Sequence, residues 1–361
     1  MFIAIFLFIL LIGVLVLVHE WGHFFVARKF GVRVEEFAFG FPPRIASVTK
    51  NGVRYALNLF PIGGYVKIYG EGGEGSGDPA SFSARPVWQR IAIIAAGVVM
   101  NAVLAWALFS ASHAIGLPTV IEDNDPAPDA RVMVIAVDPD SPAGSAGIQF
   151  GDVIRAVRTE EPIGSPRVVT RVEEVQEFVG AHRGRVVHLE LLRGSEEMTI
   201  AVLPRENPPE GEGPLGIALV RAGVVRVPWW RAPLEGAKTT GDVLALTARA
   251  LGDTASRFLS RGEVGTDVAG PIGIFVFANE TRQLGVAYFL RLIGVLSVNL
   301  ALLNILPIPA LDGGRVLFLF IEKVRGVRVN ERLEQAVHTV GFVLLLLLIL
   351  SITYRDIVRF F

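Results

Sequence analysis

The sequence predicts a polytopic α-helical membrane protein with four transmembrane helices, a membrane-associated β-hairpin and an inserted extracytoplasmic β-rich domain. Three observations support this fold class. Hydrophobic residues form 52% of the 361-residue chain, a high share for a soluble domain. They gather in four segments, each close to the roughly 20 residues that a helix needs to cross a bilayer. A long section between the second and third segments instead carries strand and turn patterns.

The four predicted spans lie near residues 2–26, 91–109, 286–308 and 338–354. No basic region precedes the first apolar run and no small-residue cleavage site follows it, so we interpret this segment as a retained helix and not a signal peptide. Lys and Arg residues cluster in the loop between the first two spans and in the loop between the last two. This bias predicts that both loops are cytoplasmic, and that both termini and the section from about 110 to 280 are extracytoplasmic.

The net charge and the cysteine content narrow the classes of partner and site. A net charge of −1 argues against nucleic acid as a main partner, and a chain without cysteine has neither disulfides nor thiolate metal ligands. The lipid bilayer is the partner that the composition predicts. The sequence divides into a first membrane part at 1–117, the inserted domain with its linkers at 118–215, an extracytoplasmic helical region at 216–283 and a second membrane part at 284–361.

Residues 37–69, which follow the first span, predict a β-hairpin beside the membrane. Apolar and polar residues alternate from Arg54 to Leu59, and the Asn51-Gly52 pair before them is typical of a hairpin turn. The stretch Pro61–Tyr65 is predicted to be a flexible apolar loop. A strand edge at this place could pair with an extended peptide, but a simple cytoplasmic connector fits the pattern equally well.

The inserted section has the pattern of a small β-rich domain. Residues 131–204 predict a strand, a loop that leads into a second strand, a short amphipathic helix and a hairpin. The loop contains SPAGSAGIQFGDVI, residues 141–154. This combination resembles a PDZ domain, a module that binds peptides by strand addition. The resemblance makes Ala146, Gly147 and Ile148 candidate peptide-binding residues; a β-rich domain of another type is the alternative.

Residues 234–259 predict an amphipathic helix, because apolar residues recur along one face. The segment is too polar to span the membrane. Two placements remain open from the sequence: the helix could lie on the outer membrane surface, or it could pack against the inserted domain.

The end of the first apolar segment carries the groups that could do chemistry. The run Phe2–Val18 leads into HEWGH, residues 19–23, where ionisable side chains are costly and usually functional. In a helix, His19 and His23 lie one turn apart on one face, so both imidazoles can hold a single zinc ion. Glu20 can then reach a water molecule at that ion and act as a general base.

A third ligand is predicted at the end of the third span. There the chain reads NILPIPALDGG, in which Pro307 and Pro309 interrupt the helix and Asp312 follows in an apolar context. The predicted topology puts this motif and the HEWGH motif at the cytoplasmic ends of their spans, and therefore at the same depth. Asp312 is thus the candidate third ligand.

With these motifs the sequence resembles the site-2 proteases, which are zinc intramembrane metalloproteases. It is most similar to the bacterial branch with a PDZ domain, typified by the regulator of sigma-E protease. The likeness covers HEWGH, the FGFPP and PIGGYVKIYGE stretches, the PDZ-like insert, GPIGIF and NILPIPALDGG. It implies a three-helix core, a membrane-associated β-sheet and zinc (Zn2+) as the cofactor. The implied residues are the zinc ligands His19, His23 and Asp312, the base Glu20, and the substrate-binding residues Asn304, Gly63, Gly64 and Tyr65.

The resemblance also implies a function. We expect a zinc-dependent endopeptidase of the bacterial cytoplasmic membrane that cleaves membrane-embedded protein substrates. These would be single-span proteins such as anti-sigma factors, already trimmed by an upstream site-1 protease, or remnant signal peptides. One departure lies in the second span, where Val98 stands at a position that is proline in many members, although Asn101 is kept.

Other functions compete with this interpretation. A non-catalytic membrane scaffold or chaperone could capture peptides through the PDZ-like domain without using Glu20. A membrane zinc protease of the prenyl-protein-processing kind would take a downstream glutamate as third ligand, which the LDG motif argues against. A zinc transporter would need a second polar cluster along a path, and the sequence shows one cluster.

Overall fold

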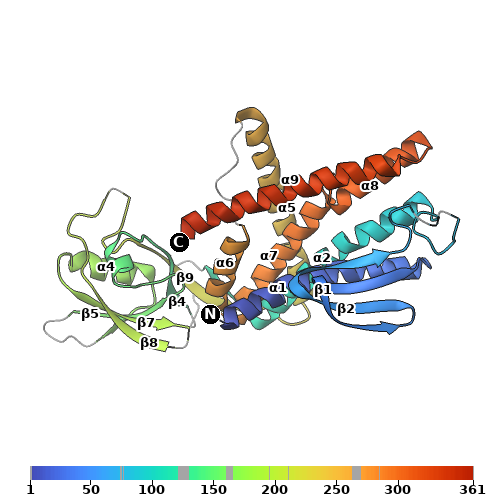
Figure 1. The fold of residues 1–361 in the computed structure, drawn as a ribbon. Helices are drawn as coiled ribbons and strands as arrows, with labels where there is room; N and C mark the ends of the chain where they lie inside the picture. Colours follow the sequence, from blue (N-terminus) through green and yellow to red (C-terminus); the bar gives the residue numbers. More distant parts are fainter. Residues whose placement is uncertain are drawn as a thin grey trace. The chain divides into compact units, whose positions relative to one another are not determined.

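The computed structural model describes residues 2–73, 75, 77–120, 130–159, 166–194, 196–209, 211–261, 270–283 and 285–360. The chain forms two compact units (Figure 1). The first, which we call the membrane unit, comprises Met1–Ala111, Pro233–Ala278 and Leu290–Phe361. The second, the β unit, comprises Ser112–Ala232 and Asn279–Phe289.

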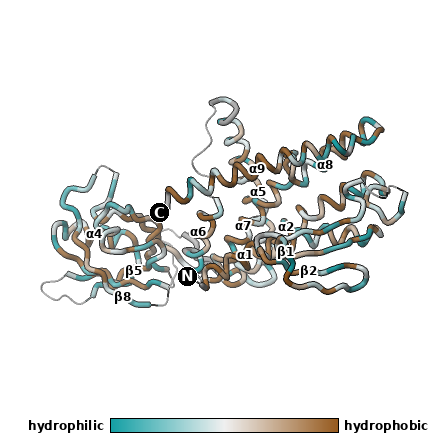
Figure 2. Tube along the Cα trace, viewed as in Figure 1, coloured by the Kyte–Doolittle hydropathy of each residue, from teal (hydrophilic) through white to brown (hydrophobic). Residues whose placement is uncertain are grey.

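Within the described part of the chain, four helices are long and apolar enough to cross a membrane, which confirms the predicted polytopic fold class. They are α1 (Phe2–Lys29), α2 (Val87–Ile115), α7 (Val286–Ile305) and α9 (Glu331–Phe360). Figure 2 shows hydrophobic residues along α1, α7 and α9. α7 ends at Ile305, before the predicted boundary at 308, because Pro307 has no N–H for a helical hydrogen bond and disfavours helical backbone in the residue before it.

The predicted hairpin is formed by β1 (Val34–Lys50) and β2 (Val53–Ile68), which pair antiparallel around the Asn51-Gly52 turn. Both turn residues have positive φ, 52° and 78°, as a two-residue hairpin turn requires. β2 runs beside α1 (Figure 1). The hairpin therefore brings a strand to the helix that carries the HEWGH motif.

The prediction of a flexible loop at Pro61–Tyr65 is wrong, because this stretch lies within β2. Gly64 pairs with Phe39 and Tyr65 with Ala38. Pairing with β1 on both sides of residues 61–63, at Phe60 and at Gly64, overrides the local turn propensity of proline and glycine. Gly63 keeps a φ of 108°, and a Cβ there would lie 2.8 Å from the Phe41 ring, so glycine permits a strand at this point.

Three further helices are α5 (Ala232–Arg261), α6 (Pro271–Gln283) and α8 (Asp312–Arg325). Val243 and Leu244 of α5 pack against Phe109 of α2 and Val298 of α7. Thr247 Oγ1 also donates to Asn299 Oδ1 at 3.0 Å. The amphipathic helix thus packs against two spanning helices. Neither placement considered from the sequence, on the outer membrane surface or against the inserted domain, included this contact. Packing partners that are distant in sequence leave no signal in the helix itself.

The β unit contains one antiparallel sheet, in the order β3-β9-β4-β5-β7-β8, with β6 beside β5. Its strands are β3 (Leu117–Val120), β4 (Arg131–Val137), β5 (Val153–Thr159), β6 (Arg167–Val168), β7 (Val187–Arg193), β8 (Glu196–Val202) and β9 (Ile217–Val225). Its helices are α3 (Pro142–Ser145) and α4 (Val172–Ala181). Val175 and Val179 of α4 pack with Ile154, Leu189 and neighbouring side chains in a continuous apolar core. The sheet extends past residue 215, where the sequence placed the domain boundary, because β9 pairs with β4.

A buried ion pair joins the PDZ-like loop to the sheet. Asp152 is fully buried, and both of its carboxylate oxygens accept hydrogen bonds of 2.7 Å from Arg193. Arg193 also donates to Gly147 O at 2.7 Å. Such a bidentate pair fixes the loop relative to β7, and a buried carboxylate is tolerated only while it remains paired.

We predict that Arg193→Met destabilises the β unit by about 3 kcal/mol, because it leaves the Asp152 carboxylate buried without its counter-charge. Hydrogen–deuterium exchange of the β5 and β7 amides in the full chain measures the effect. Glu197→Gln is the control: it removes the more exposed ion pair with Arg155 and should change stability by less than about 1 kcal/mol. Equal effects of the two variants would contradict the special role of the buried pair.

Candidate metal centre

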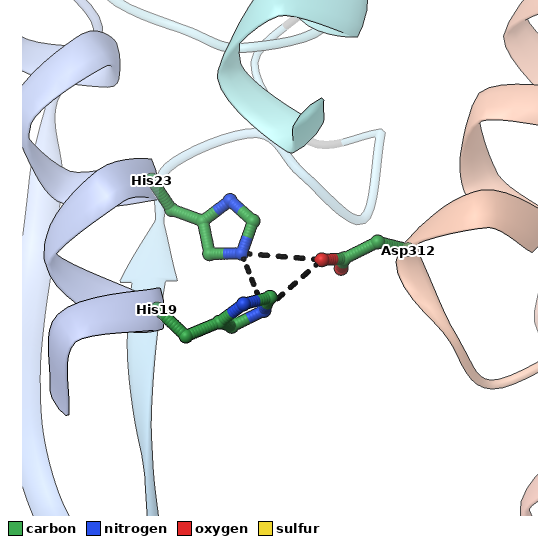
Figure 3. Close-up of side chains that lie close together, drawn as sticks. All are labelled: His19, His23 and Asp312. Carbon is green, nitrogen blue, oxygen red and sulfur yellow. Dashed lines mark hydrogen bonds and ion pairs between the residues drawn. The ribbon is translucent and has the colours of Figure 1, made fainter. Parts of the chain in front are cut away.

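Three side chains from two helices converge in the membrane unit. His19 and His23 lie one turn apart on α1, and Asp312 is the first residue of α8 (Figure 3). Asp312 Oδ2 lies 3.1 Å from His19 Nε2 and 3.4 Å from His23 Nε2, and the two Nε2 atoms are 3.1 Å apart. Both histidines are buried. Two imidazole nitrogens and one carboxylate oxygen that meet in this way form a candidate metal centre.

The donor set fits zinc. Catalytic zinc sites use three protein ligands of the histidine and carboxylate type and leave the fourth position open. Asp312 Oδ2 has no conventional hydrogen-bond donor among the described residues, which fits an oxygen that faces a cation. Burial raises the pKa of Asp312, but the two adjacent histidines outweigh it and hold the pKa far below its usual range.

One face of α2 orients the two histidines. His23 Nδ1 lies 2.9 Å from the Ile93 carbonyl oxygen, to which it can donate. His19 Nδ1 lies 3.2 Å from Nδ2 of the Asn101 side-chain amide, and Asn101 is fully buried. A histidine that binds metal through Nε2 carries its proton on Nδ1, so an acceptor at each Nδ1 selects the correct tautomer. The Asn101 amide supplies that acceptor when its oxygen faces His19, since amide oxygen and nitrogen exchange by a half-turn.

Gly97 lies between these two contacts on the same face of α2. A Cβ there would lie 2.5 Å from His23 Nε2 and 2.6 Å from His19 Cε1. Residues 93, 97 and 101 follow one another at four-residue spacing, which places them on one helical face. That four-residue spacing is the signal in the sequence for these contacts, which the predicted site residues did not include.

Glu20 and Asn304 also reach this centre. Glu20 Oε2 accepts a hydrogen bond of 2.9 Å from the backbone N–H of Val66 in β2. Asn304 Nδ2, near the end of α7, lies 3.4 Å from His19 Nε2. The proposed base therefore lies between the metal ligands and the β-hairpin, and Asn304 borders the ligands themselves.

The predicted Gly63-Gly64-Tyr65 segment lies in β2, one residue before the Val66 that contacts Glu20. Tyr65 Oη donates to Glu36 Oε1 at 2.9 Å, within a cluster that includes Arg44 and Arg54. Burial raises the pKa of Glu36, but the hydrogen bonds from Tyr65 and the arginines lower it more, and the net shift is downward. A carboxylate held in its charged form thus anchors this part of the strand.

The candidate PDZ residues lie in the β unit. Ile148 is buried in its hydrophobic core and Ala146 packs against that core, while the Gly147 carbonyl accepts from Arg193. The Ile148 side chain is therefore part of the core and is not available to contact a peptide.

We predict that Gly97→Ala lowers the affinity of the chain for a divalent metal by about tenfold or more, because the added methyl group displaces both histidines. Zinc content after dialysis against a graded chelator series measures the effect. Gly241→Ala is the matched control, since a Cβ at this helical glycine of α5 meets nothing within 4 Å. An unchanged affinity in Gly97→Ala would show that the histidines tolerate displacement.

The comparisons with known proteins agree with this geometry. Residues 7–348 match the model of peptidase family M50. The chain is 28% identical to the regulator of sigma-W protease RasP of Bacillus subtilis and 30% identical to the zinc metalloprotease RasP of Bacillus licheniformis, with 98% of each chain covered in both cases. It is 32% identical to a chloroplastic protein of Arabidopsis thaliana whose name describes a membrane metalloprotease, over 95% of this chain and 77% of that protein. These matches confirm the family resemblance, and the chain belongs to peptidase family M50, as a zinc metalloprotease with several membrane-spanning helices.

Proposed function

We propose that this metalloprotease cleaves the transmembrane segments of single-span membrane proteins near their cytoplasmic side. The observation that carries the proposal is the position of the metal centre: His19 and His23 lie on an apolar helix of spanning length, and Asp312 meets them there. Burying ionisable groups in such a helix costs free energy, so they are usually present because a function requires them. A protease site that lies within the membrane region is closest to the transmembrane segments of other proteins, which are therefore the expected substrates.

The proposed roles follow from the contacts around the centre. His19, His23 and Asp312 would hold the zinc ion, which when bound would supply Lewis-acid chemistry to the scissile carbonyl and to a nearby water molecule. Glu20 takes a proton from the attacking water and returns it to the leaving amine. Asn304 lies beside His19 and can hold the substrate next to the ligands.

The hairpin offers a place for the unwound substrate. A helix in the membrane has its carbonyl groups hydrogen-bonded internally, so it must become extended before hydrolysis. The Val66 N–H points to Glu20 and not to β1, which indicates that the outer edge of β2 faces the catalytic groups. An extended substrate that adds to this edge beside Gly63, Gly64 and Tyr65 would lie next to Glu20.

The finer topology and the partners belong to the same proposal. The charge bias places the loop between α1 and α2 and the loop between α8 and α9 in the cytoplasm, with both termini and the β unit outside. We place the chain in a bacterial cytoplasmic membrane. Its substrates would be anti-sigma factors trimmed by an upstream protease, or remnant signal peptides.

We predict that Glu20→Gln keeps its zinc but loses cleavage of a purified single-span substrate by about 10²- to 10⁴-fold, since it removes the general base without removing a ligand. Cleavage in detergent and zinc content are measured on the same samples. Asp312→Asn is the companion variant and should lose both zinc and cleavage. Equal cleavage by wild type and Glu20→Gln would favour a non-catalytic scaffold or chaperone.

The PDZ-like domain is proposed to select trimmed substrates, either by binding a newly exposed C-terminus or by excluding intact ectodomains. Arg131 and Ala222 are cross-strand partners in β4 and β9, so their backbones lie about 5 Å apart. A short Gly-Ser linker can therefore replace residues 132–221 without stretching the chain.

We predict that this replacement removes the preference for trimmed over full-length substrate, because the selecting domain is gone. The ratio of the two cleavage rates measures it in the full membrane unit. Lower cleavage of the trimmed substrate would indicate peptide binding, and higher cleavage of the full-length substrate would indicate size exclusion. An unchanged ratio would contradict both roles.

A further inference from the structure

The turn that presents Asp312 has an unusual backbone. Two residues before Asp312, Ala310 has a φ of 77°, in the left-handed region that residues other than glycine rarely adopt. A turn in this conformation persists only where surrounding contacts hold it. The contacts that other elements make with this turn therefore help to set the position of Asp312.

His338 of α9 makes one such contact. Its Nδ1 accepts a hydrogen bond of 2.9 Å from the Ala310 backbone N–H, across 28 residues of sequence. This arrangement places the ring proton on Nε2. His338 thus satisfies a backbone donor in the turn that leads to Asp312, and it does so from a different helix.

Packing on both sides of this hydrogen bond fixes the position of the ring. One turn along α9, a Cβ at Gly341 would lie 2.4 Å from Pro309 Cβ, so the helix and the turn are in close contact. The Phe318 ring of α8 lies 5.6 Å from the His338 ring. α9 therefore contacts the turn at two points. The His338 ring bonds the Ala310 N–H, and the α9 backbone at Gly341 lies against Pro309.

We propose that His338 is a positioning residue for the metal centre, which holds the Ala310 turn so that the Asp312 carboxylate faces His19 and His23. The inference rests on the proposed role of Asp312 as a zinc ligand. His338 touches neither metal nor substrate and acts through the backbone of residues 310–312. Removing a hydrogen bond that orients a metal ligand, without itself touching the metal, commonly lowers metal affinity by about 10- to 100-fold.

Two substitutions separate the hydrogen bond from the ring. His338→Phe keeps an aromatic ring against Phe318 but removes the acceptor, whereas His338→Asn loses the ring but can place an amide oxygen near the position of Nδ1. Thr339→Val is the neighbouring control, since Thr339 bonds only within α9 in the described structure. Asp312→Asn tests the ligand assignment itself.

The full chain in detergent is measured for zinc affinity, by competition with a chelator, and for the visible absorption bands of the cobalt(II)-substituted protein. We expect His338→Phe to bind zinc about 10- to 100-fold more weakly and to change the cobalt bands. His338→Asn and Thr339→Val should stay near wild type in both measurements. The cobalt bands report ligand geometry, which a purely structural role of His338 would leave unchanged.

The possible contrary results are distinct. If Asp312→Asn binds metal like wild type, the ligand assignment in the proposed function fails, and this inference fails with it. If Asp312→Asn loses metal while His338→Phe keeps wild-type affinity and bands, only the inference is overturned. A lower melting temperature of His338→Phe with unchanged cobalt bands, or a larger loss in His338→Asn than in His338→Phe, would assign His338 to packing alone.

Discussion

The close approach of α1 and α2 is the constraint on which the metal centre depends. Gly22 and Gly97 allow it: a Cβ at Gly22 would lie 2.4 Å from the Ala96 carbonyl oxygen, and a Cβ at Gly97 would enter the space of both histidine rings. Small residues let helices in a membrane come close enough for polar contacts between them. Here that proximity brings the Ile93 carbonyl and the Asn101 amide to the two Nδ1 atoms.

The second half of the centre depends on a broken helix. α7 stops before Pro307, and α8 begins with Asp312 itself, so the ligand lies at a helix start. Gly313 and Gly314 pack against the carbonyl groups of residues 305–308 so closely that a Cβ on either would lie within 2.4 Å of a carbonyl oxygen. Irregular backbone near a membrane is tolerated where protein surrounds it. The glycines after Asp312 therefore explain why the LDGG sequence suits this turn.

The hairpin reaches the metal centre through the contact of β2 with Glu20. β2 pairs with β1 and lies beside α1, and its Val66 N–H reaches Glu20. A single strand thus borders Glu20, the proposed general base, and is the proposed docking edge for an extended peptide. In the proposed mechanism, the strand that orders the substrate would also contact the group that activates water, which couples the two demands of proteolysis in a membrane.

The sequence by itself determined the spanning helices, the hairpin turn and the pairing of His19 with His23, since these depend on hydrophobic length, turn chemistry and helical spacing. It also indicated Asp312 through the proline-broken motif and the charge bias of the loops. Only the tertiary structure decided that residues 61–65 form a strand, that α5 covers α2 and α7, and that Asn101 and His338 support the centre. These features arise from contacts between segments far apart in the chain, and such contacts leave no periodic pattern in the local sequence.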